Sequence, residues 1–173
     1  MKYFLISQEV TYTDVPRIIN WYEKINPKWI NKDEAYRLPS RELLFIGLQD
    51  RVTYTDILTK PFFLMSTMVR DVTRMYDPLS DMKEIILLDA ERRKSKLYFL
   101  PILEEVECLE ETFGLKRKTR DISLDYDKVK DKFVFIAKGN KSRYIVGNLE
   151  WVESLLKRGA TGVGLQEIAY RIR

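Results

Sequence analysis

The side chains that could perform chemistry in this 173-residue chain are its carboxylates, because the chain contains no histidine. Histidine is the usual general base near neutral pH and the usual partner of a serine or cysteine nucleophile, so the standard hydrolytic triads are excluded. Cys108 is the only cysteine, which excludes an intrachain disulfide and a zinc site built from cysteine and histidine. An enzyme built on Asp, Glu, Lys or Tyr remains open, and metal chemistry would depend on carboxylates alone.

Four aspartates are the candidates for such a histidine-free enzyme. Asp14, Asp50, Asp56 and Asp89 could converge in the folded chain, but no spaced carboxylate pair is present in the sequence. The glycines of Thr161–Leu165 follow a predicted helix, whereas a phosphate-binding loop precedes one. The sequence therefore indicates no catalytic, cofactor-binding or metal-binding residue, and the carboxylate enzyme is kept as an alternative.

The highest density of charge lies in an acidic segment, Glu104–Glu111, which holds five glutamates in eight positions. The basic run Lys116–Arg120 follows it. Such a charge run is usually a solvated face, here an exposed edge strand or a segment rich in turns. The functional alternative is a docking strip, in which charged side chains accelerate association and select the partner. The candidate partner-binding residues are Glu104, Glu105, Glu107, Glu110 and Glu111.

Composition narrows the class of protein. The fractions of 45% hydrophobic and 32% charged residues are ordinary for a soluble globular chain, and the length suits one domain, residues 1–173, with 1–101 and 102–173 as alternative lobes. No apolar run approaches a membrane span, and Glu9 interrupts any signal-peptide core, so we expect a cytoplasmic protein. The net charge of +4 comes from 30 basic and 26 acidic residues, a mixed surface that argues against nucleic-acid binding. A regulatory or nucleic-acid-binding protein is nevertheless kept as an alternative.

The most complete structural signal lies in Arg143–Ile168. Tyr144–Val146 has the β-branched and aromatic residues of a strand, and Asn148 is a good N-cap. Apolar residues then recur at the spacing of a helical face to residue 158, where Gly159 supplies a left-handed C-terminal residue. Thr161–Leu165 predicts a strand whose two glycines lie against another backbone or a helix.

This run resembles the C-terminal signature of a bacterial immunity-protein family, the group numbered eleven among those of polymorphic toxin systems. The resemblance is carried by the strand, by the helix end Leu155–Gly159 and above all by the Thr-Gly-Val that follows. Family members commonly have serine at the helix cap, where this chain has Gly147-Asn148. The structural signature comprises Gly159, Thr161, Gly162 and Val163.

Less specific matches extend the resemblance over residues 43 to 170, among them Asp56–Leu58 and Ser66. The resemblance implies an α+β protein that is made beside a toxin and neutralises it by stoichiometric binding. It implies no catalytic residue and no cofactor. The expected partner is the cognate protein toxin.

The remaining patterns predict an α+β domain with mainly antiparallel sheet and helices near residues 16–24, 67–76 and 149–158. A strand at Lys2–Ser7 is continuously apolar and is expected to be central. Each half has a buried strand, Leu43–Ile46 in the first and Phe133–Ile136 in the second, followed by a second strand, a capped helix and a closing strand, which indicates either a weak internal duplication or a shared local folding pattern. A change of apolar parity near Gln166-Glu167 predicts a bulge. The aromatic cluster Trp21, Tyr22 and Trp29 is interpreted as core, with a partner-binding patch as the alternative.

Overall fold

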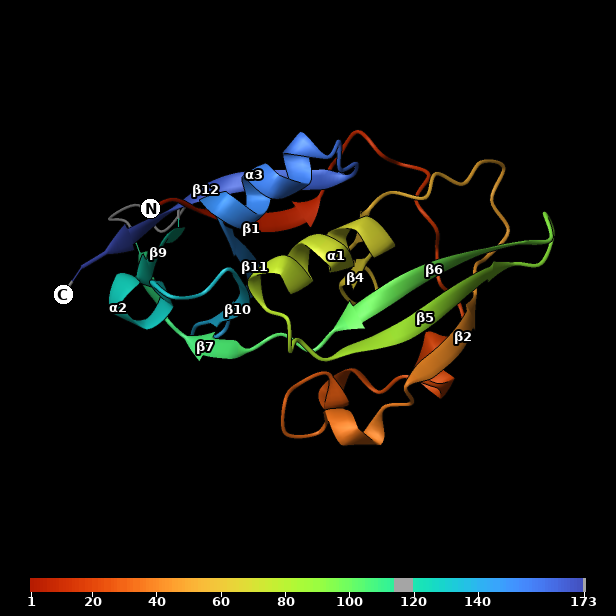
Figure 1. Ribbon diagram of the computed structural model, residues 1–173, viewed down its shortest axis with the longest axis horizontal. Helices are drawn as coiled ribbons and strands as arrows, with labels where there is room; N and C mark the ends of the chain where they lie inside the picture. The colour runs from red at the N-terminus through yellow and green to blue at the C-terminus, as the bar shows by residue number, and fades with distance from the viewer. Residues whose placement is uncertain (114–119, 173) are drawn as a thin grey trace.

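The computed structural model describes residues 1–113 and 120–172, and these residues form three α-helices and twelve strands (Figure 1). The α+β class predicted from the sequence is confirmed, but both sheets are mixed, because each contains a parallel pair beside its antiparallel ones. The strands are β1 (Tyr3–Gln8), β2 (Arg41–Phe45), β3 (Ile57–Leu58), β4 (Leu64–Met65), β5 (Met82–Asp89), β6 (Lys94–Pro101), β7 (Glu105–Glu107), β8 (Leu109–Phe113), β9 (Arg120–Asp125), β10 (Val134–Lys138), β11 (Arg143–Asn148) and β12 (Val163–Arg171).

Both sheets contain the same five-strand topology. The first unit, residues 41–101, has the order β2-β5-β6-β4-β3, in which only β2 and β5 are parallel. The second unit, residues 120–171 together with β1, has the order β9-β12-β1-β11-β10, in which only β9 and β12 are parallel. In each unit one helix joins the two strands that flank the central strand. The repeat of strand, helix and strand predicted from the sequence is therefore present as a repeated topology.

The outer strands of the two units are equivalent to each other in a different way from that predicted from the sequence. The sequence matched Leu43–Ile46, in β2, with Phe133–Ile136, in β10. The topology instead makes β9 the counterpart of β2 and β3 the counterpart of β10. The central strand of the second unit is β1, so the N-terminal strand belongs with the C-terminal strands and not with a lobe of residues 1–101.

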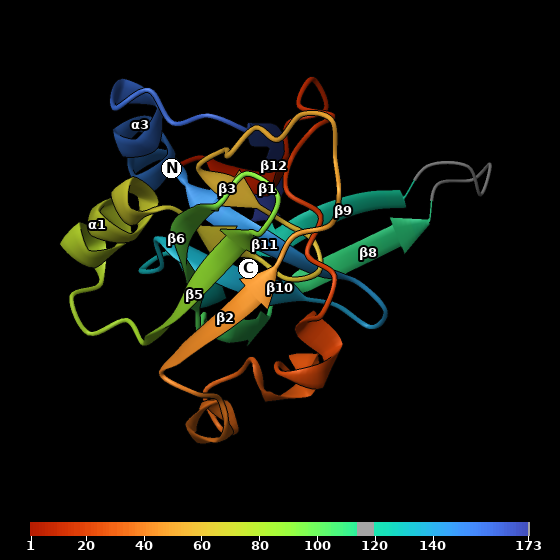
Figure 2. The same ribbon diagram turned by 90° about the vertical axis from the view of Figure 1, so that its right-hand side faces the viewer.

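The seven-stranded sheet has one further strand at each edge, and these two strands are consecutive in the chain. β7 pairs with β10 at one edge, and β8 pairs with β9 at the other. Cys108 lies between them, and its carbonyl accepts a hydrogen bond from the Asp125 amide at 2.9 Å. The sheet therefore curls until its two edges are joined by one chain segment. Figure 2 shows β8 and β9 extending together from the body of the molecule.

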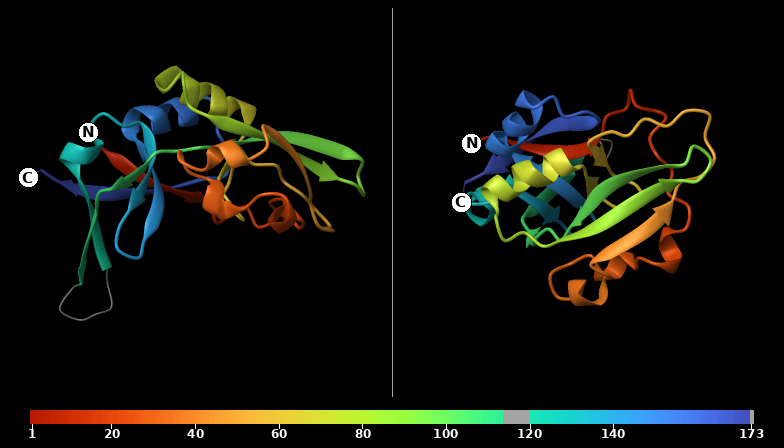
Figure 3. Two further views of the ribbon diagram at one scale, coloured as in Figure 1. Left: turned by 90° about the horizontal axis from the view of Figure 1, so that it is seen from below. Right: turned by 45° about the vertical axis from the view of Figure 1, so that its right-hand side comes forward.

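The helices α1 (Thr67–Tyr76) and α3 (Leu149–Lys157) lie side by side on the same side of the two sheets (Figures 1 and 3). Both begin as predicted: the side chains of Ser66 and Asn148 accept hydrogen bonds from the third amide of each helix. A central apolar cluster beneath them takes Val69 from α1 and Leu155 from α3. Two further clusters fill the opposite faces of the two sheets. The third α-helix is the short α2 (Tyr126–Val129).

The helix predicted near residues 16–24 is wrong. Residue Ile18 forms an antiparallel bridge with Ile46, and the Ile19 amide donates to the carbonyl of Phe45 at 3.0 Å. Asp14 accepts a hydrogen bond from the Thr53 hydroxyl at 2.7 Å and caps no helix. Pairing with the end of β2 thus overrides the local helical pattern, and three short 3-10 helices follow, at Trp21–Glu23, Pro27–Trp29 and Ala35–Arg37.

The bulge predicted near Gln166-Glu167 is also wrong, because β12 pairs with β1 in one unbroken register. The change of parity has another cause. Val163 faces the central cluster beneath the helices, whereas Ile168 and Tyr170 face the cluster on the opposite side of the sheet. The strand therefore changes which of its two faces is apolar without changing its backbone geometry.

Candidate partner-binding surface

The helix side of the first unit carries an apolar surface beyond the end of α1. Here α1 covers only part of the sheet. It contacts β6 at Phe99, whose ring centre lies 4.4 Å from the Arg70 guanidinium. Strands β6, β5 and β2 continue past it, as the right-hand view of Figure 3 shows. On this side they carry the apolar cross-strand row Leu43, Ile86 and Leu97 and the adjacent pair Phe45 and Leu88, next to which β6 has Ser95.

Ile19 extends this surface past the edge of β2, because the position of a Cβ atom on Gly47 would lie 3.0 Å from its side chain. We call the whole surface the apolar sheet face. Ile19 is 47% exposed, and Phe45 and Leu97 are each 37% exposed. Large apolar side chains that are contiguous and solvent-accessible mark interaction surfaces more often than singly scattered ones. The apolar sheet face comprises Ile19, Leu43, Phe45, Ile86, Leu88 and Leu97.

The repeated topology provides an internal comparison for this surface. The counterpart of β5 in the second unit is β12, and its residues on the helix side beyond Leu165 are Glu167, Ala169 and Arg171, all exposed. The corresponding run of β5 carries Ile86 and Leu88. Since the same arrangement of strands tolerates charged residues at the second site, the fold does not require the apolar residues at the first.

The charge around the apolar sheet face is mainly positive. The Arg17 side chain lies beside Gly47, and Arg93 and Lys94 are exposed at the turn between β5 and β6. Two carboxylates nearby are already paired, Glu84 with Arg41 and Asp89 with Arg92. The hydrogen bond that Asp89 accepts from the Arg92 backbone, together with the Arg92 side chain, lowers the pKa of Asp89. Glu91 is an exposed acidic residue in the same turn, and the cations outnumber it.

The acidic segment predicted as a docking strip is spread over the two opposite edges of the seven-stranded sheet. Glu104 contacts Lys132 at 2.8 Å and Lys32 at 3.6 Å. The hydrogen bond from Lys132 is the main cause of a lowered pKa at Glu104, against the opposing effect of burial. On β7, burial opposes ionisation of Glu105, but the hydrogen bond from Lys138 and the charge of Arg143 outweigh it and lower its pKa.

The other three glutamates of the segment do not form one surface with these. Glu107 is exposed at the β7 edge, whereas Glu110 and Glu111 lie on β8, where Glu110 is 3.8 Å from Arg171. Of the basic run, residues 116–119 lie outside the described residues, and Arg120 begins β9. Intramolecular cations thus offset much of the negative charge of the segment, and its role in partner binding stays a prediction.

The signature residues connect the two units. Gly159 has a φ of 74° and ends α3 with the paired bonds Gly159 N–H to Leu156 and Ala160 N–H to Leu155. The amide and hydroxyl of Thr161 both donate to one oxygen of Asp56, at 2.8 and 2.9 Å. The other Asp56 oxygen accepts from the Ser66 hydroxyl at 2.6 Å.

Gly162 and Val163 complete this junction. Gly162 has a φ of 75°, and a Cβ atom there would lie 2.5 Å from the Cβ of Thr55. Val163 packs against the central apolar cluster. The predicted approach to another backbone is present at Gly164, where a Cβ atom would lie 3.1 Å from the Ser7 carbonyl oxygen, whereas Gly162 meets the Thr55 and Gln8 side chains. The segments Asp56–Leu58 and Thr161–Val163, which both contribute to the family resemblance, meet in the structure.

The four aspartates considered for an enzyme do not share one pocket. Asp14, Asp56 and Asp89 are held by Thr53, by Ser66 and Thr161, and by Arg92, respectively. Asp50 lines an open surface depression with Glu91 and Arg92. Within residues 1–113 and 120–172, no group of three or more Cys, Asp or Glu side chains is arranged to hold a metal ion. Burial raises the pKa of the single thiol, Cys108, to about 11.

The aromatic cluster is divided between core and surface. Trp21 and Trp29 are half-buried against the apolar cluster of the first unit, and Trp21 meets Phe62 edge to face at 6.1 Å between ring centroids. Tyr22 also contacts Trp21 edge to face but is 65% exposed. The core interpretation therefore holds for the two tryptophans.

The apolar sheet face was not among the sequence predictions, although its signal was present. Ile85–Leu88 has four consecutive apolar residues, and such a run makes both faces of a strand apolar. Of these, Ile85 and Leu87 are buried in the core of the first unit, whereas Ile86 and Leu88 face the helix side. A ten-residue helix is too short to cover three strands of this length, and that comparison of lengths could have predicted the uncovered surface.

Comparison with protein-family models and with curated proteins gave no match. Among the described residues, the helices are too short and too polar for any of them to traverse a bilayer.

Proposed function

We propose that this protein is an immunity-type protein that neutralises a co-encoded bacterial toxin by binding it stoichiometrically. The observation that carries the proposal is the apolar sheet face, which the fold does not require and which has the exposed apolar residues of a protein interface. The resemblance of the Thr161–Val163 region to an immunity-protein family supplies the class of partner. The separation of the candidate aspartates favours binding over catalysis.

The chemistry of the surface specifies what the toxin should present to it. Phe45 and Leu97 are each 37% exposed on the two strands that flank β5, and a large aromatic or aliphatic side chain that becomes buried contributes most of the affinity of an interface. Arg17 beside Gly47, and Arg93 and Lys94 at the β5–β6 turn, border this area with positive charge. We therefore expect the toxin to contact it through an apolar patch bordered by aspartate and glutamate.

The test combines a protection titration with binding measurements on the co-encoded toxin. Protection should be complete at about one protein per toxin, because an occupied toxin molecule is not released. The double variant Phe45→Glu and Leu97→Glu should weaken binding by about 100-fold or more, as expected when two large apolar interface residues are lost and two carboxylates are placed beside an acidic partner. Calorimetry gives the affinity, and thermal denaturation of each variant confirms that it is folded.

Leu165→Glu is the matched control, since Leu165 is 36% exposed on the equivalent strand of the second unit. It should bind the toxin as the parent does. Equal binding by the double variant would remove the apolar sheet face from the interface. Protection at far below one protein per toxin would overturn the stoichiometric mechanism in favour of an enzyme. Sedimentation of the protein alone tests a second copy as the occupant, and a stable dimer that the double variant abolishes would replace the toxin in this role.

A further inference from the structure

β2 is the terminal strand of the five-stranded sheet, so its outer edge carries backbone groups on which another strand could pair. The Ile46 amide, just past the end of β2, donates to the carbonyl of Leu88 in β5 at 3.0 Å. Because the backbone groups of a strand alternate between its two neighbours, those of Leu43 and Phe45 face away from β5. These outward groups are the ones that a further strand would bind.

An ion pair covers the outward groups of Leu43. The Lys24 Nζ donates to the Leu43 carbonyl at 2.7 Å. It also lies 3.3 Å from the Glu42 Oε1, and the same oxygen accepts from the Leu43 amide at 2.9 Å. One lysine and one glutamate therefore occupy both the acceptor and the donor of this residue.

The outward groups of Phe45 are covered by the segment that runs along the end of β2. The Phe45 amide donates to the Asn20 Oδ1 at 2.9 Å, and its carbonyl accepts from the Ile19 amide at 3.0 Å. Asn20 immediately precedes the 3-10 helix Trp21–Glu23, but its side chain makes no capping hydrogen bond to that helix. The Asn20 side chain is thus directed to the edge of β2 in place of the helix.

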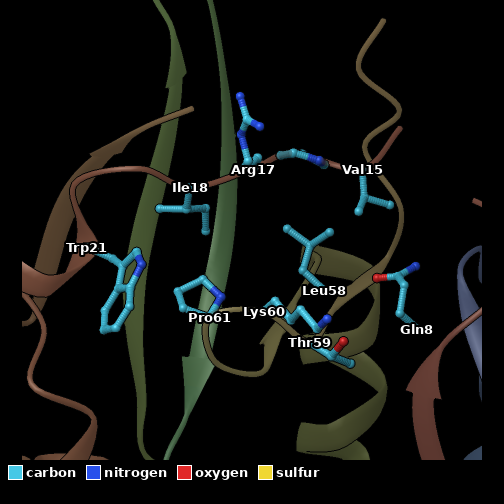
Figure 4. A pocket seen from close by; sticks show the side chains of 10 residues that line it. Gln8, Val15, Arg17, Ile18, Trp21, Leu58, Thr59, Lys60 and Pro61 are labelled. Carbon is cyan, nitrogen blue, oxygen red and sulfur yellow. The ribbon is translucent and has the colours of Figure 1, made fainter. Parts of the chain in front are cut away.

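The segment that carries Lys24 is fixed by its apolar residues. Ile18 and Ile25 are buried in the apolar cluster of the first unit, and Trp21 is half-buried against it. Ile18 and Trp21 line one pocket together with Pro61 (Figure 4). The core therefore holds the backbone on both sides of Lys24, while its side chain extends to a strand edge that the backbone does not join.

The second unit shows what the same position of the fold accepts. β9 is the counterpart of β2, and its outer edge is paired with a further antiparallel strand, β8. At the opposite edge of that unit, β10 is paired with β7. This arrangement of strands thus takes an added strand at the position where β2 carries the Lys24–Glu42 ion pair instead.

We infer that the outer edge of β2 is a strand-addition site that the Lys24–Glu42 pair keeps closed, and that the occupant it excludes is β2 of a second copy of this chain. Two antiparallel β2 strands centred on Glu42 would pair through the outward groups of Arg41 and Leu43. Leu43 belongs to the apolar sheet face, so such pairing would bring two of these faces together. Charged side chains on an edge strand prevent association of this kind. The inference concerns the chain alone and is independent of the toxin.

The test is sedimentation equilibrium of an open-edge variant, Lys24→Met and Glu42→Thr. Methionine keeps the length of the lysine stem, threonine suits a strand, and the net charge is unchanged. The parent should be monomeric. The association constant of the variant should be higher by about tenfold or more, because each copy gains a backbone donor and acceptor that the ion pair occupied. The matched control, Lys28→Met and Glu23→Thr, changes two exposed residues in the same way and should behave as the parent.

Two further measurements locate the contact. The Leu43 amide should exchange its hydrogen faster in the dilute open-edge variant than in the parent, and it should be protected again as the variant associates. Leu97→Glu, added to the open-edge variant, should leave the association constant unchanged, because Leu97 lies on β6, two strands from the edge.

A folded open-edge variant that stays monomeric would overturn the inference. Association that Leu97→Glu abolishes would do the same, since the contact would then be the apolar sheet face. Equal association of the control would assign the effect to added apolar surface and not to the edge. If the double variant does not fold, Lys24→Met alone still frees the Leu43 carbonyl and should raise the association constant about threefold, and an unchanged constant would reject the closed edge.

Discussion

Asp56 joins the two units through both oxygens of its carboxylate, one to Thr161 and the other to Ser66. Its amide also donates to the carbonyl of Thr161 at 3.0 Å. Ser66 in turn caps α1, so the start of that helix and the segment that follows α3 are fixed by one side chain. Residues that are 105 positions apart in the sequence thus form a single polar junction.

Two glycines that follow α3 separate two costs of substitution, the strain of a left-handed backbone and the overlap of a new side chain with its neighbours. Gly159 and Gly162 both have a positive φ, but a Cβ atom at Gly159 would meet nothing within 4 Å, whereas at Gly162 it would overlap Thr55. Gly159→Ala should therefore destabilise by only about 1 to 2 kcal/mol, the cost of the left-handed backbone. Gly162→Ala should cost more, about 3 kcal/mol or above, because the steric overlap adds to that strain. Urea denaturation of both variants measures the difference, and equal losses would show that Thr55 moves aside freely.

Among single residues, the sequence predicted the roles of those that depend only on nearby positions in the chain. Ser66, Asn148 and Gly159 are helix-terminal residues, and each lies where its local pattern placed it. The hydrogen bonds between Asp56 and Thr161 depend on how two distant segments pack, and no local pattern encodes that distance.

The elements were predicted well where the apolar period was strong and poorly where a neighbouring strand intervened. The two long helices were found, since each is stabilised by contacts within one stretch of sequence. Residues 16–24 have a helical period, but the backbone pairs with the end of β2 instead. The sequence also could not show that the acidic segment divides into two strands at opposite edges of a sheet.

The ion pairs of Glu105 on β7 predict how the free energy of unfolding changes with pH. The pKa of Glu105 is lowered in the folded protein, so its contribution is present above the ordinary glutamate pKa of 4.5 and is lost as the pH falls through the lowered value. Glu105→Gln should reduce the free energy of unfolding at pH 7 by at most about 1 kcal/mol, since the pairs are partly exposed. At a pH below the folded pKa, the variant and the parent should unfold alike.

Glu107→Gln is the control on the same strand, because Glu107 is exposed and lacks an ion pair among the described residues. Its effect on the free energy of unfolding should be small at either pH. A deficit of Glu105→Gln that persists undiminished at low pH would mean that the side chain acts through packing and not through its charge.

Among the described residues, two units of one topology share a central apolar cluster and the junction at Asp56. The units differ in connectivity, because the chain supplies the central strand of the first unit last, as β6, and that of the second unit first, as β1. They also differ in surface, since only the first unit has the apolar sheet face. The sequence indicated the repeat through its order of strand, helix and strand, but the wrapping of β1 into the C-terminal sheet was beyond any local pattern.

A circular permutant tests this description of the topology. Tyr3 pairs with Ile168 on antiparallel strands, so the start of β1 lies beside the last part of β12. A chain that begins at Val10 and joins residue 173 to Met1 through a linker of about five residues should fold, because every strand keeps its neighbours. Its circular dichroism should match the parent, and its free energy of unfolding should lie within about 2 kcal/mol of it. Deletion of residues 1–9 is the contrasting variant, and it should not fold, since it removes the centre of the sheet.

The place of β1 also sets the timing of folding on the ribosome. β1 precedes β2 to β10 in the chain, whereas its two partners, β11 and β12, follow all of them. At ordinary translation rates the delay is on the order of ten seconds. The first unit can assemble during that interval, whereas the apolar side chains of Tyr3 to Ile6 stay without their strand partners until β11 and β12 have been synthesised. The nascent chain therefore carries an aggregation-prone strand during that time, and the second sheet closes only when β12 has left the exit tunnel.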